Sequence, residues 1–115
     1  MKPGDHADVT RRFSAQDIAD FVALSGGPQT DHVPEPLIGA LFSYLPGVKL
    51  PGPGTNYLKQ SLRFTTRARL EPPLTVRVEI TRLRDTGLVD LSTTCCLPDG
   101  TLLCSGRVLV RDTDA

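Results

Sequence analysis

A run of nine residues without a charged side chain, residues 37–45, constrains the fold of this chain more than any other segment. Pro36 precedes the run, and proline suits the first turn of an α-helix because the N–H that it lacks would have no partner there. The run therefore predicts a helix that starts at Pro36 and ends at Pro46 and Gly47. A helix that is apolar on every side is expected to be completely buried. Other elements must therefore wrap around it.

Two later segments alternate between apolar and polar residues, which indicates strands with one buried face. In residues 74–81 the expected buried face consists of Leu74, Val76, Val78 and Ile80. In residues 55–66 it consists of Leu58, Leu62 and Phe64, with Gln60 among them. The opposite, wetter face of that strand is expected to carry Tyr57, Lys59, Ser61 and Arg63. Both strands are expected to lie against the apolar helix.

The last third of the chain predicts a long hairpin around the turn Pro98-Asp99-Gly100. Its expected core positions are Val89, Leu91, Thr93, Cys95 and Leu97 on one arm and Leu102, Cys104, Val108 and Val110 on the other. The three cysteines, Cys95, Cys96 and Cys104, are an odd number and lack the spacing of a disulfide framework or a zinc site. We therefore expect them to be reduced packing residues.

The N-terminal part of the chain predicts a second helix. Ser14 and Asp17 have the spacing of a capping box, and apolar residues continue at helical intervals to Leu24 before Gly26, Gly27 and Pro28 stop the segment. Residues 8–13 predict a short edge strand. The expected order is a strand, a helix, a buried helix and then long antiparallel strands. This order predicts one α+β domain over residues 1–115, with an antiparallel sheet wrapped on a central apolar helix, which is a hot-dog-like arrangement.

Charge and hydropathy narrow the classes of partner. The 13 basic and 13 acidic side chains balance, so no overall field attracts nucleic acid or an acidic membrane surface. The sequence shows neither a signal peptide nor a run of about eighteen apolar residues that would cross a membrane. We therefore expect a soluble cytoplasmic protein with no nucleic-acid or membrane partner.

Several segments resemble MaoC-like (R)-specific enoyl-thioester hydratases. They are residues 13–26, the turn-rich link at residues 50–55, the strand Tyr57-Leu58-Lys59-Gln60-Ser61-Leu62-Arg63-Phe64, and the later strand and hairpin. The resemblance implies a hot-dog domain that binds an acyl thioester of coenzyme A or acyl carrier protein and needs no metal or redox cofactor. It also implies a homodimer in which sheet edges join and the pocket lies between subunits.

The motif that carries the chemistry in this family is altered here. Members of this family resemble one another in an Asp-x-Asn-Pro-x-His stretch that follows Ser-Gly. In that stretch, Asp and His together activate water. Counted from Ser25-Gly26, His32 occupies the histidine position, but Gly27 replaces the aspartate and Gln29 the asparagine. Glu35 is the preferred substitute carboxylate and Asp31 the other candidate. Without one of them, efficient hydration is not expected.

About a dozen residues that the family usually carries between this histidine and the central helix are also missing. In the family, a glycine amide near the helix start polarises the thioester carbonyl, and Ile38 or Gly39 are the candidates for that role here. Gln60 is either a satisfied polar group or a ligand of the acyl or pantetheine amide, and the former is favoured. Tyr44 either lines a pocket or is a core aromatic with its hydroxyl at the surface, and the latter is favoured.

Three classes of function follow. The first is an enoyl-CoA or enoyl-carrier-protein hydratase, or a 3-hydroxyacyl dehydratase, with altered chemistry. The second is an inactive acyl-thioester-binding protein, or a subunit of a heterodimer with an intact MaoC-like chain that supplies the missing aspartate. The third is a thioesterase, which is the weakest because residues 37–45 contain no carboxylate to act as its base.

Overall fold

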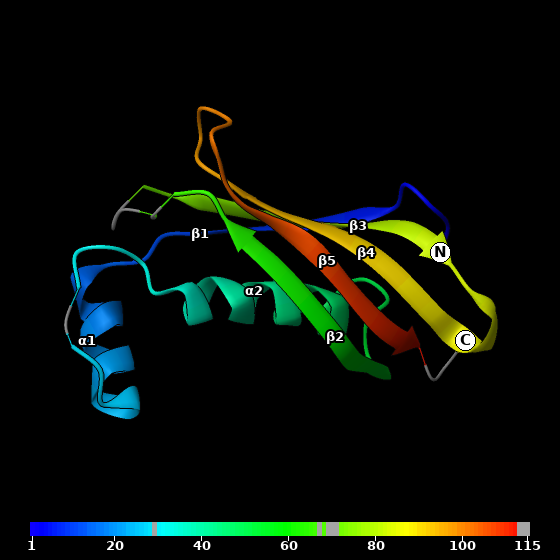
Figure 1. Ribbon diagram of the computed structural model, residues 1–115, viewed down its shortest axis with the longest axis horizontal. Helices are drawn as coiled ribbons and strands as arrows, with labels where there is room; N and C mark the ends of the chain where they lie inside the picture. The colour runs from blue at the N-terminus through cyan, green and yellow to red at the C-terminus, as the bar shows by residue number, and fades with distance from the viewer. Residues whose placement is uncertain (29, 67, 69–71, 113–115) are drawn as a thin grey trace.

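Five antiparallel strands and two helices make up the fold. A computed structural model describes residues 1–28, 30–66, 68 and 72–112. The elements are β1 (His6–Arg11), α1 (Ala15–Ser25), α2 (Glu35–Val48), β2 (Thr55–Phe64), β3 (Leu74–Leu83), β4 (Leu88–Cys96) and β5 (Leu102–Asp112), with a short 3₁₀ turn at Asp85–Gly87. The strand order is β1-β3-β4-β5-β2 (Figure 1). In the described ranges, no helix is long and apolar enough to cross a membrane.

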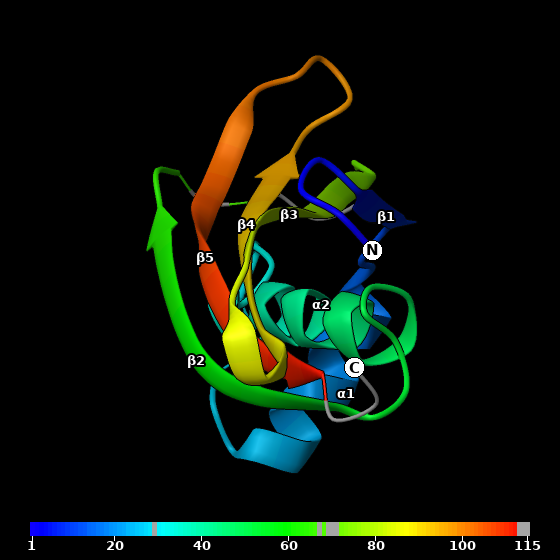
Figure 2. The same cartoon turned by 90° about the vertical axis from the view of Figure 1, so that its right-hand side faces the viewer.

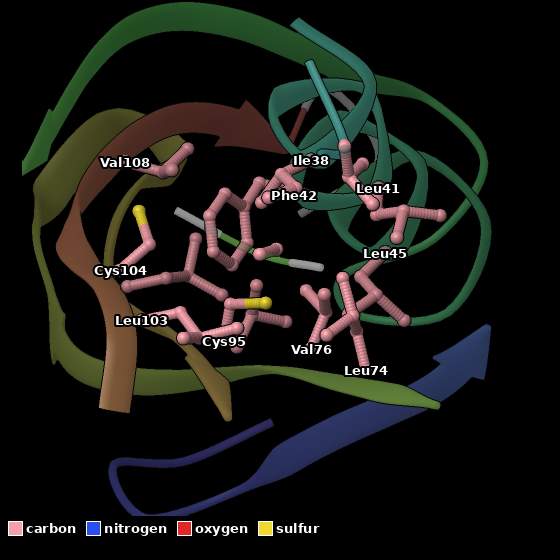
Figure 3. Packing of buried hydrophobic residues seen from close by; sticks show 14 of the residues in the cluster. Ile38, Leu41, Phe42, Leu45, Leu74, Val76, Cys95, Leu103, Cys104 and Val108 are labelled. Carbon is pink, nitrogen blue, oxygen red and sulfur yellow. The ribbon is translucent and has the colours of Figure 1, made fainter. Parts of the chain in front are cut away.

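The sheet curves around α2, so that the helix lies inside the bend (Figure 2). Figure 3 shows Phe42 of α2 directed towards the side chains of the sheet, among them Cys95 and Leu103. Phe42 and Leu45 are completely buried, as are Leu74 and Val76 of β3. The predicted antiparallel sheet around an apolar helix is therefore confirmed. The apolar side chains of the helix and of the concave sheet face remove each other from water, which stabilises both.

The expectation that α2 is completely buried is wrong. One side of the helix is covered by the sheet, but Ala40, Ser43 and Tyr44 are exposed on the other. The predicted helix end is wrong as well, because α2 continues through Pro46 and Gly47 to Val48. Proline removes only one backbone donor near the end of the helix, and its ring is buried, so the helix tolerates it.

Two irregularities reverse the predicted alternation of side chains. The register of β2 against β5 shifts between Tyr57 and Lys59, so Tyr57 packs against the core whereas Leu58 is 49% exposed. The register of β4 against β5 shifts between Cys95 and Cys96, so Leu103 is buried instead of Leu102. An extra residue in one strand of a pair changes the face of the side chains on one side of the bulge only. Beyond the bulges, Leu62, Phe64, Val108 and Val110 keep their predicted core face.

The remaining strand predictions agree with the structure. Leu74, Val76, Val78 and Ile80 of β3 are all buried, and the predicted edge strand is present as β1, two residues earlier than expected. Cys95 and Cys104 are buried free thiols opposite each other on neighbouring strands, which confirms the expectation of packing residues for this pair. Burial raises the pKa of Cys95 to about 12.

Candidate active site at the start of the central helix

The predicted capping box fixes the beginning of α1. The Ser14 side chain accepts a hydrogen bond from the Asp17 amide at 3.2 Å, and the Asp17 carboxylate accepts one from the Ser14 amide at 2.9 Å. The hydrogen bond from the Ser14 amide lowers the pKa of Asp17. The helix ends at Gly26, whose positive φ of 79° suits glycine, and whose amide donates to the Val22 carbonyl. Both ends of α1 are therefore specified locally, and the loop to α2 starts from a defined point.

His32 lies in this loop and is held by its neighbours. The amide of Val33 donates to the Ala68 carbonyl at 2.7 Å, and the Val33 side chain is buried. The Thr30 hydroxyl donates to the His32 carbonyl at 2.8 Å. Both hydrogen bonds hold the peptide unit between His32 and Val33, next to the imidazole, whose side chain keeps 27% of its surface exposed. A positioned histidine with access to solvent is suited to proton transfer near neutral pH.

The two candidate carboxylates take different positions relative to His32. Asp31 Oδ1 lies 3.4 Å from His32 Nδ1, although the Asp31 side chain is fully exposed. Glu35 makes no ion pair with His32 in the part of the chain that the structure describes. Its charge acts instead on buried Cys104, whose pKa rises to about 11 because of burial and the proximity of Glu35. The structure thus brings together His32 and Asp31, the second choice of the sequence analysis.

Gly27, at the position of the family's aspartate, has room for a side chain. A Cβ built on Gly27 would meet Ser25 Oγ at 3.7 Å, an ordinary van der Waals contact, and the backbone there is not left-handed. Glycine is therefore not required at this position by either space or backbone conformation. Gln29, the other altered position of the motif, lies outside the described residues.

The first turn of α2 offers one free backbone donor, which the sequence analysis missed. Pro34 is the N-cap and Pro36 the second helical residue, so neither has an N–H, and the Leu37 amide donates to the Pro34 carbonyl. Among the described residues, the Glu35 amide has no partner. Ile38 and Gly39 lie beyond the first turn, where N–H groups bond to helix carbonyls. The signal in the sequence was the alternation Pro34-Glu35-Pro36. Because proline has no N–H, Glu35 is the only one of these three residues with a backbone donor.

The candidate substrate-binding residues separate into three groups. Ile38 is 1% exposed and belongs to the core. Gly39 and Gln60 are brought together, since a Cβ on Gly39 would lie 3.8 Å from Gln60 Nε2. Tyr44 is 44% exposed and lines a groove between α1 and α2, away from Gln60. In the described part of the chain, no three His, Cys, Asp or Glu side chains gather as metal ligands would.

A curved antiparallel sheet around a central helix defines a hot-dog fold. No protein-family model matches the sequence. The chain is 32% identical to an (R)-specific enoyl-CoA hydratase of Aeromonas caviae over 96% of this chain and 95% of that protein. It is 29% identical to an enzyme of the same name from Rhodospirillum rubrum, over 96% of this chain and 83% of that one.

A solved structure agrees with these sequence relatives. An (R)-hydratase structure from A. caviae superimposes with a TM-score of 0.90 at 31% identity, covering 96% of each chain. The chain therefore belongs to the (R)-specific enoyl-CoA hydratase family and has its hot-dog fold, as predicted. The A. caviae enzyme aligns over 127 positions, whereas the chain has 115 residues. At least 12 positions of that alignment thus have no counterpart here, and their expected place between His32 and the central helix stays a prediction.

Proposed function

We propose that this protein hydrates 2-enoyl-CoA thioesters, or dehydrates the 3-hydroxyacyl products, at the start of α2. The observation that carries the proposal is the retained His32, held in a fixed loop beside a helix end with one free amide. Membership of the hydratase family supplies the class of substrate. No cofactor is proposed beyond the coenzyme A or phosphopantetheine that forms part of the substrate.

Two groups carry out the proposed reaction, namely the backbone amide of Glu35 and the imidazole of His32. The Glu35 N–H binds the thioester oxygen and stabilises the negative charge that develops there as water attacks the β-carbon. His32 takes a proton from the attacking water and passes it to the α-carbon, so that one water molecule is added across the double bond. Asp31, next to Nδ1, orients the ring. Because this carboxylate is exposed, we expect it to do so less well than the family's aspartate.

The thioester's pantetheine arm is proposed to pass over the exposed side chain of Gln60, next to Gly39 of α2. Gly39 has no side chain on the helix surface that faces Gln60, and the amide of Gln60 can pair with an amide of the arm. Gln60 is exposed and no hydrogen bond occupies its side chain in the described structure. This favours the ligand interpretation of Gln60 over the structural one that the sequence alone favoured. Ile38 supports this surface from the core and does not contact substrate.

The assembly is proposed to be a homodimer joined through a sheet edge, and β1 and β2 are the two edge strands. The substrate carrier is proposed to be coenzyme A, with acyl carrier protein as the alternative. Three free cysteines fit a reducing compartment, so we place the protein in the cytoplasm.

The decisive experiment follows the loss of enoyl absorbance with crotonyl-CoA and 2-octenoyl-CoA, and identifies the 3-hydroxyacyl product by mass spectrometry. His32→Ala is expected to lower kcat/KM by about a hundredfold to ten-thousandfold. His6→Ala is the matched control, because His6 is the chain's other histidine and is exposed on β1. Equal rates for the two variants would contradict the role of His32.

A second pair of variants identifies the carboxylate. Asp31→Asn is expected to lower turnover more than Glu35→Gln, since only Asp31 contacts the ring and the Glu35 variant keeps its backbone amide. Gly27→Asp restores the family's residue at a position with room for it and is expected to raise turnover. If Glu35→Gln lowered turnover more than Asp31→Asn, the role of orienting His32 would belong to Glu35.

The second candidate function, an inactive subunit of a heterodimer, is favoured by Gly27 alone. The heterodimer hypothesis predicts that the purified chain alone shows no turnover. It also predicts that turnover appears when the chain is mixed with an intact MaoC-like chain. Gly27→Asp also separates the two proposals, because activity gained by the variant without a partner would show that the chain lacks only the carboxylate.

A further inference from the structure

A hollow with a volume of about 430 Å³ lies on the outer face of the sheet, the face turned away from α2. Side chains alternate between the two faces of a strand, and Val89 and Leu91 belong to the core that β4 shares with α2. Asp90, between them, therefore lies on the outer face. The same alternation places Arg107 of β5 there, because Val108 is in the core. The side chains of this face that line the hollow are Lys59, Ser61, Arg84, Asp90, Arg107 and Leu109.

The strand register brings the polar side chains of the hollow together. Ser61 of β2 lies opposite Arg107 of β5, and Lys59 lies opposite Leu109. Asp90 of β4 lies opposite Leu109 on the other side of β5. Opposite residues of an antiparallel pair have Cβ atoms about 5 Å apart. One small ligand can therefore reach Lys59, Ser61 and Arg107 at the same time.

An ion pair fixes Arg84 at the edge of the hollow. Its Nε and Nη2 atoms donate to the two carboxylate oxygens of Asp90 at 2.7 and 3.0 Å, and the Asp90 side chain is only 9% exposed. The Arg84 amide donates to the Leu88 carbonyl, which closes the turn at Asp85–Gly87. Thr86 in this turn has a φ of 67°, a left-handed conformation that β-branched residues seldom adopt. The ion pair and the closed turn therefore hold the guanidinium in place before a ligand arrives.

The charges of the hollow do not balance. Its carboxylate is already paired with Arg84, whereas Lys59 and Arg107 make no ion pair with any residue that the structure describes. On the part of the outer face that β1 and β3 form, by contrast, Arg77 is paired with Asp8 at 2.7 Å. Because the whole chain has a formal net charge of zero, the surplus of positive charge is a local feature of the hollow.

We propose that this hollow is a second binding site and that its ligand is a doubly charged phosphate group. The unpaired cations of Lys59 and Arg107 match two negative charges, and an ammonium, a guanidinium and the Ser61 hydroxyl supply donors to several oxygens of one phosphate. A carboxylate, with a single charge, would leave one cation unmatched. The site lies on the opposite face of the sheet from α2, so the inference does not depend on the proposed function. The phosphate belongs either to free phosphate or to the 3′-phosphate of coenzyme A.

Titration with inorganic phosphate at constant ionic strength, followed by the backbone amide signals in two-dimensional NMR spectra, tests the site. Saturable shifts are expected at residues 59–61 and 107–109. Arg107→Gln is expected to weaken phosphate binding by about tenfold or more, because a charge-assisted hydrogen bond is lost. Arg12→Gln is the matched control, because Arg12 is exposed, does not line the hollow, and its replacement changes the net charge equally. Acetate is expected to bind at least about tenfold more weakly than phosphate.

A comparison of coenzyme A with 3′-dephospho-coenzyme A identifies the source of the phosphate. If the 3′-phosphate of coenzyme A is the ligand, coenzyme A binds about tenfold or more tightly than the dephospho form, and Arg107→Gln abolishes the difference. If free phosphate is the ligand, the two coenzymes bind equally, and the shifts that phosphate causes persist in the presence of saturating coenzyme A. Either result supports the site.

Three results would overturn the inference. The first is a set of shifts that grow with phosphate concentration without saturating, which would indicate a general attraction of anions. The second is an equal loss of phosphate affinity in Arg107→Gln and Arg12→Gln. The third is equal affinity for phosphate and acetate, which would mean that the hollow does not distinguish a phosphate group from a singly charged anion.

Discussion

The sheet with α2 and the N-terminal flank, which comprises α1 and the loop to α2, differ in how they are stabilised. On β3 and β4, Leu74, Val76 and Cys95 are completely buried against α2. Within α1, Ile18 alone is buried, and Leu24 is almost fully exposed. The first region is held mainly by apolar packing, whereas the second combines two buried apolar side chains, Ile18 and Val33, with caps and single hydrogen bonds. His32 belongs to the second region, so the site can change while the fold is kept.

The largest expected difference between the regions concerns their apolar side chains. Phe42→Ala is expected to lower the free energy of unfolding by about 3 to 5 kcal/mol, because it leaves a cavity between helix and sheet. Leu24→Ala, in α1, is expected to change it by less than about 0.5 kcal/mol. Urea unfolding followed by circular dichroism measures both. Similar losses for the two variants would mean that α1 is covered in solution.

A smaller effect is expected where two strands approach closely. A Cβ on Gly106 of β5 would collide with the Ser61 carbonyl and lie 2.9 Å from the Leu62 side chain on β2. Gly106→Ala is therefore expected to cost about 1 to 3 kcal/mol of unfolding free energy. Gly47→Ala serves as control, since a Cβ there meets nothing within 4 Å. A neutral Gly106→Ala would show that the edge strand β2 can move away without loss.

The core also predicts a sensitivity to alkaline pH. Burial raises the pKa of the Cys95 thiol from 9.0 to about 12, so between these values the unfolded chain loses a proton that the folded chain keeps. Stability from this thiol is therefore fully present below pH 9 and falls as pH rises towards 12, by on the order of 1 kcal/mol at pH 10. Urea titrations at pH 8 and pH 10 measure the fall. The loss of unfolding free energy between pH 8 and pH 10 should be smaller in Cys95→Val. An equal loss in that variant would assign the effect to other titrating groups.

The smallest expected effect lies in the flank. Ser14→Ala removes the side-chain half of the capping box and is expected to cost about 1 kcal/mol. Hydrogen exchange should rise in the first turn of α1 and not in β3 or β4. Ser43→Ala, at an exposed position of α2, is the comparison. A rise that extends into the sheet would show that the two regions unfold together.

The sequence predicted features that depend on local rules. A capping box is complete within four residues, and the alternation in β3 is uninterrupted, so both were predicted correctly. The faces of Tyr57 and Leu58 were not, because a bulge adds one residue without a distinctive composition. The candidates Ile38 and Gly39 for the carbonyl-polarising amide came from the family resemblance and stay a prediction. The helix starts at Glu35, one residue before Pro36, and the Glu35 amide has no partner among the described residues, which makes it a further candidate.

The space at Gly27 has an evolutionary consequence. Two of the four glycine codons become aspartate codons by one nucleotide change, and neither steric crowding nor a left-handed backbone opposes an aspartate at Gly27. The loop is thus compatible with the aspartate of the motif that the sequence resembles. A carboxylate can be placed at this position by a single amino-acid substitution. Under the proposed function, that one substitution changes the strength of hydration while the fold is kept.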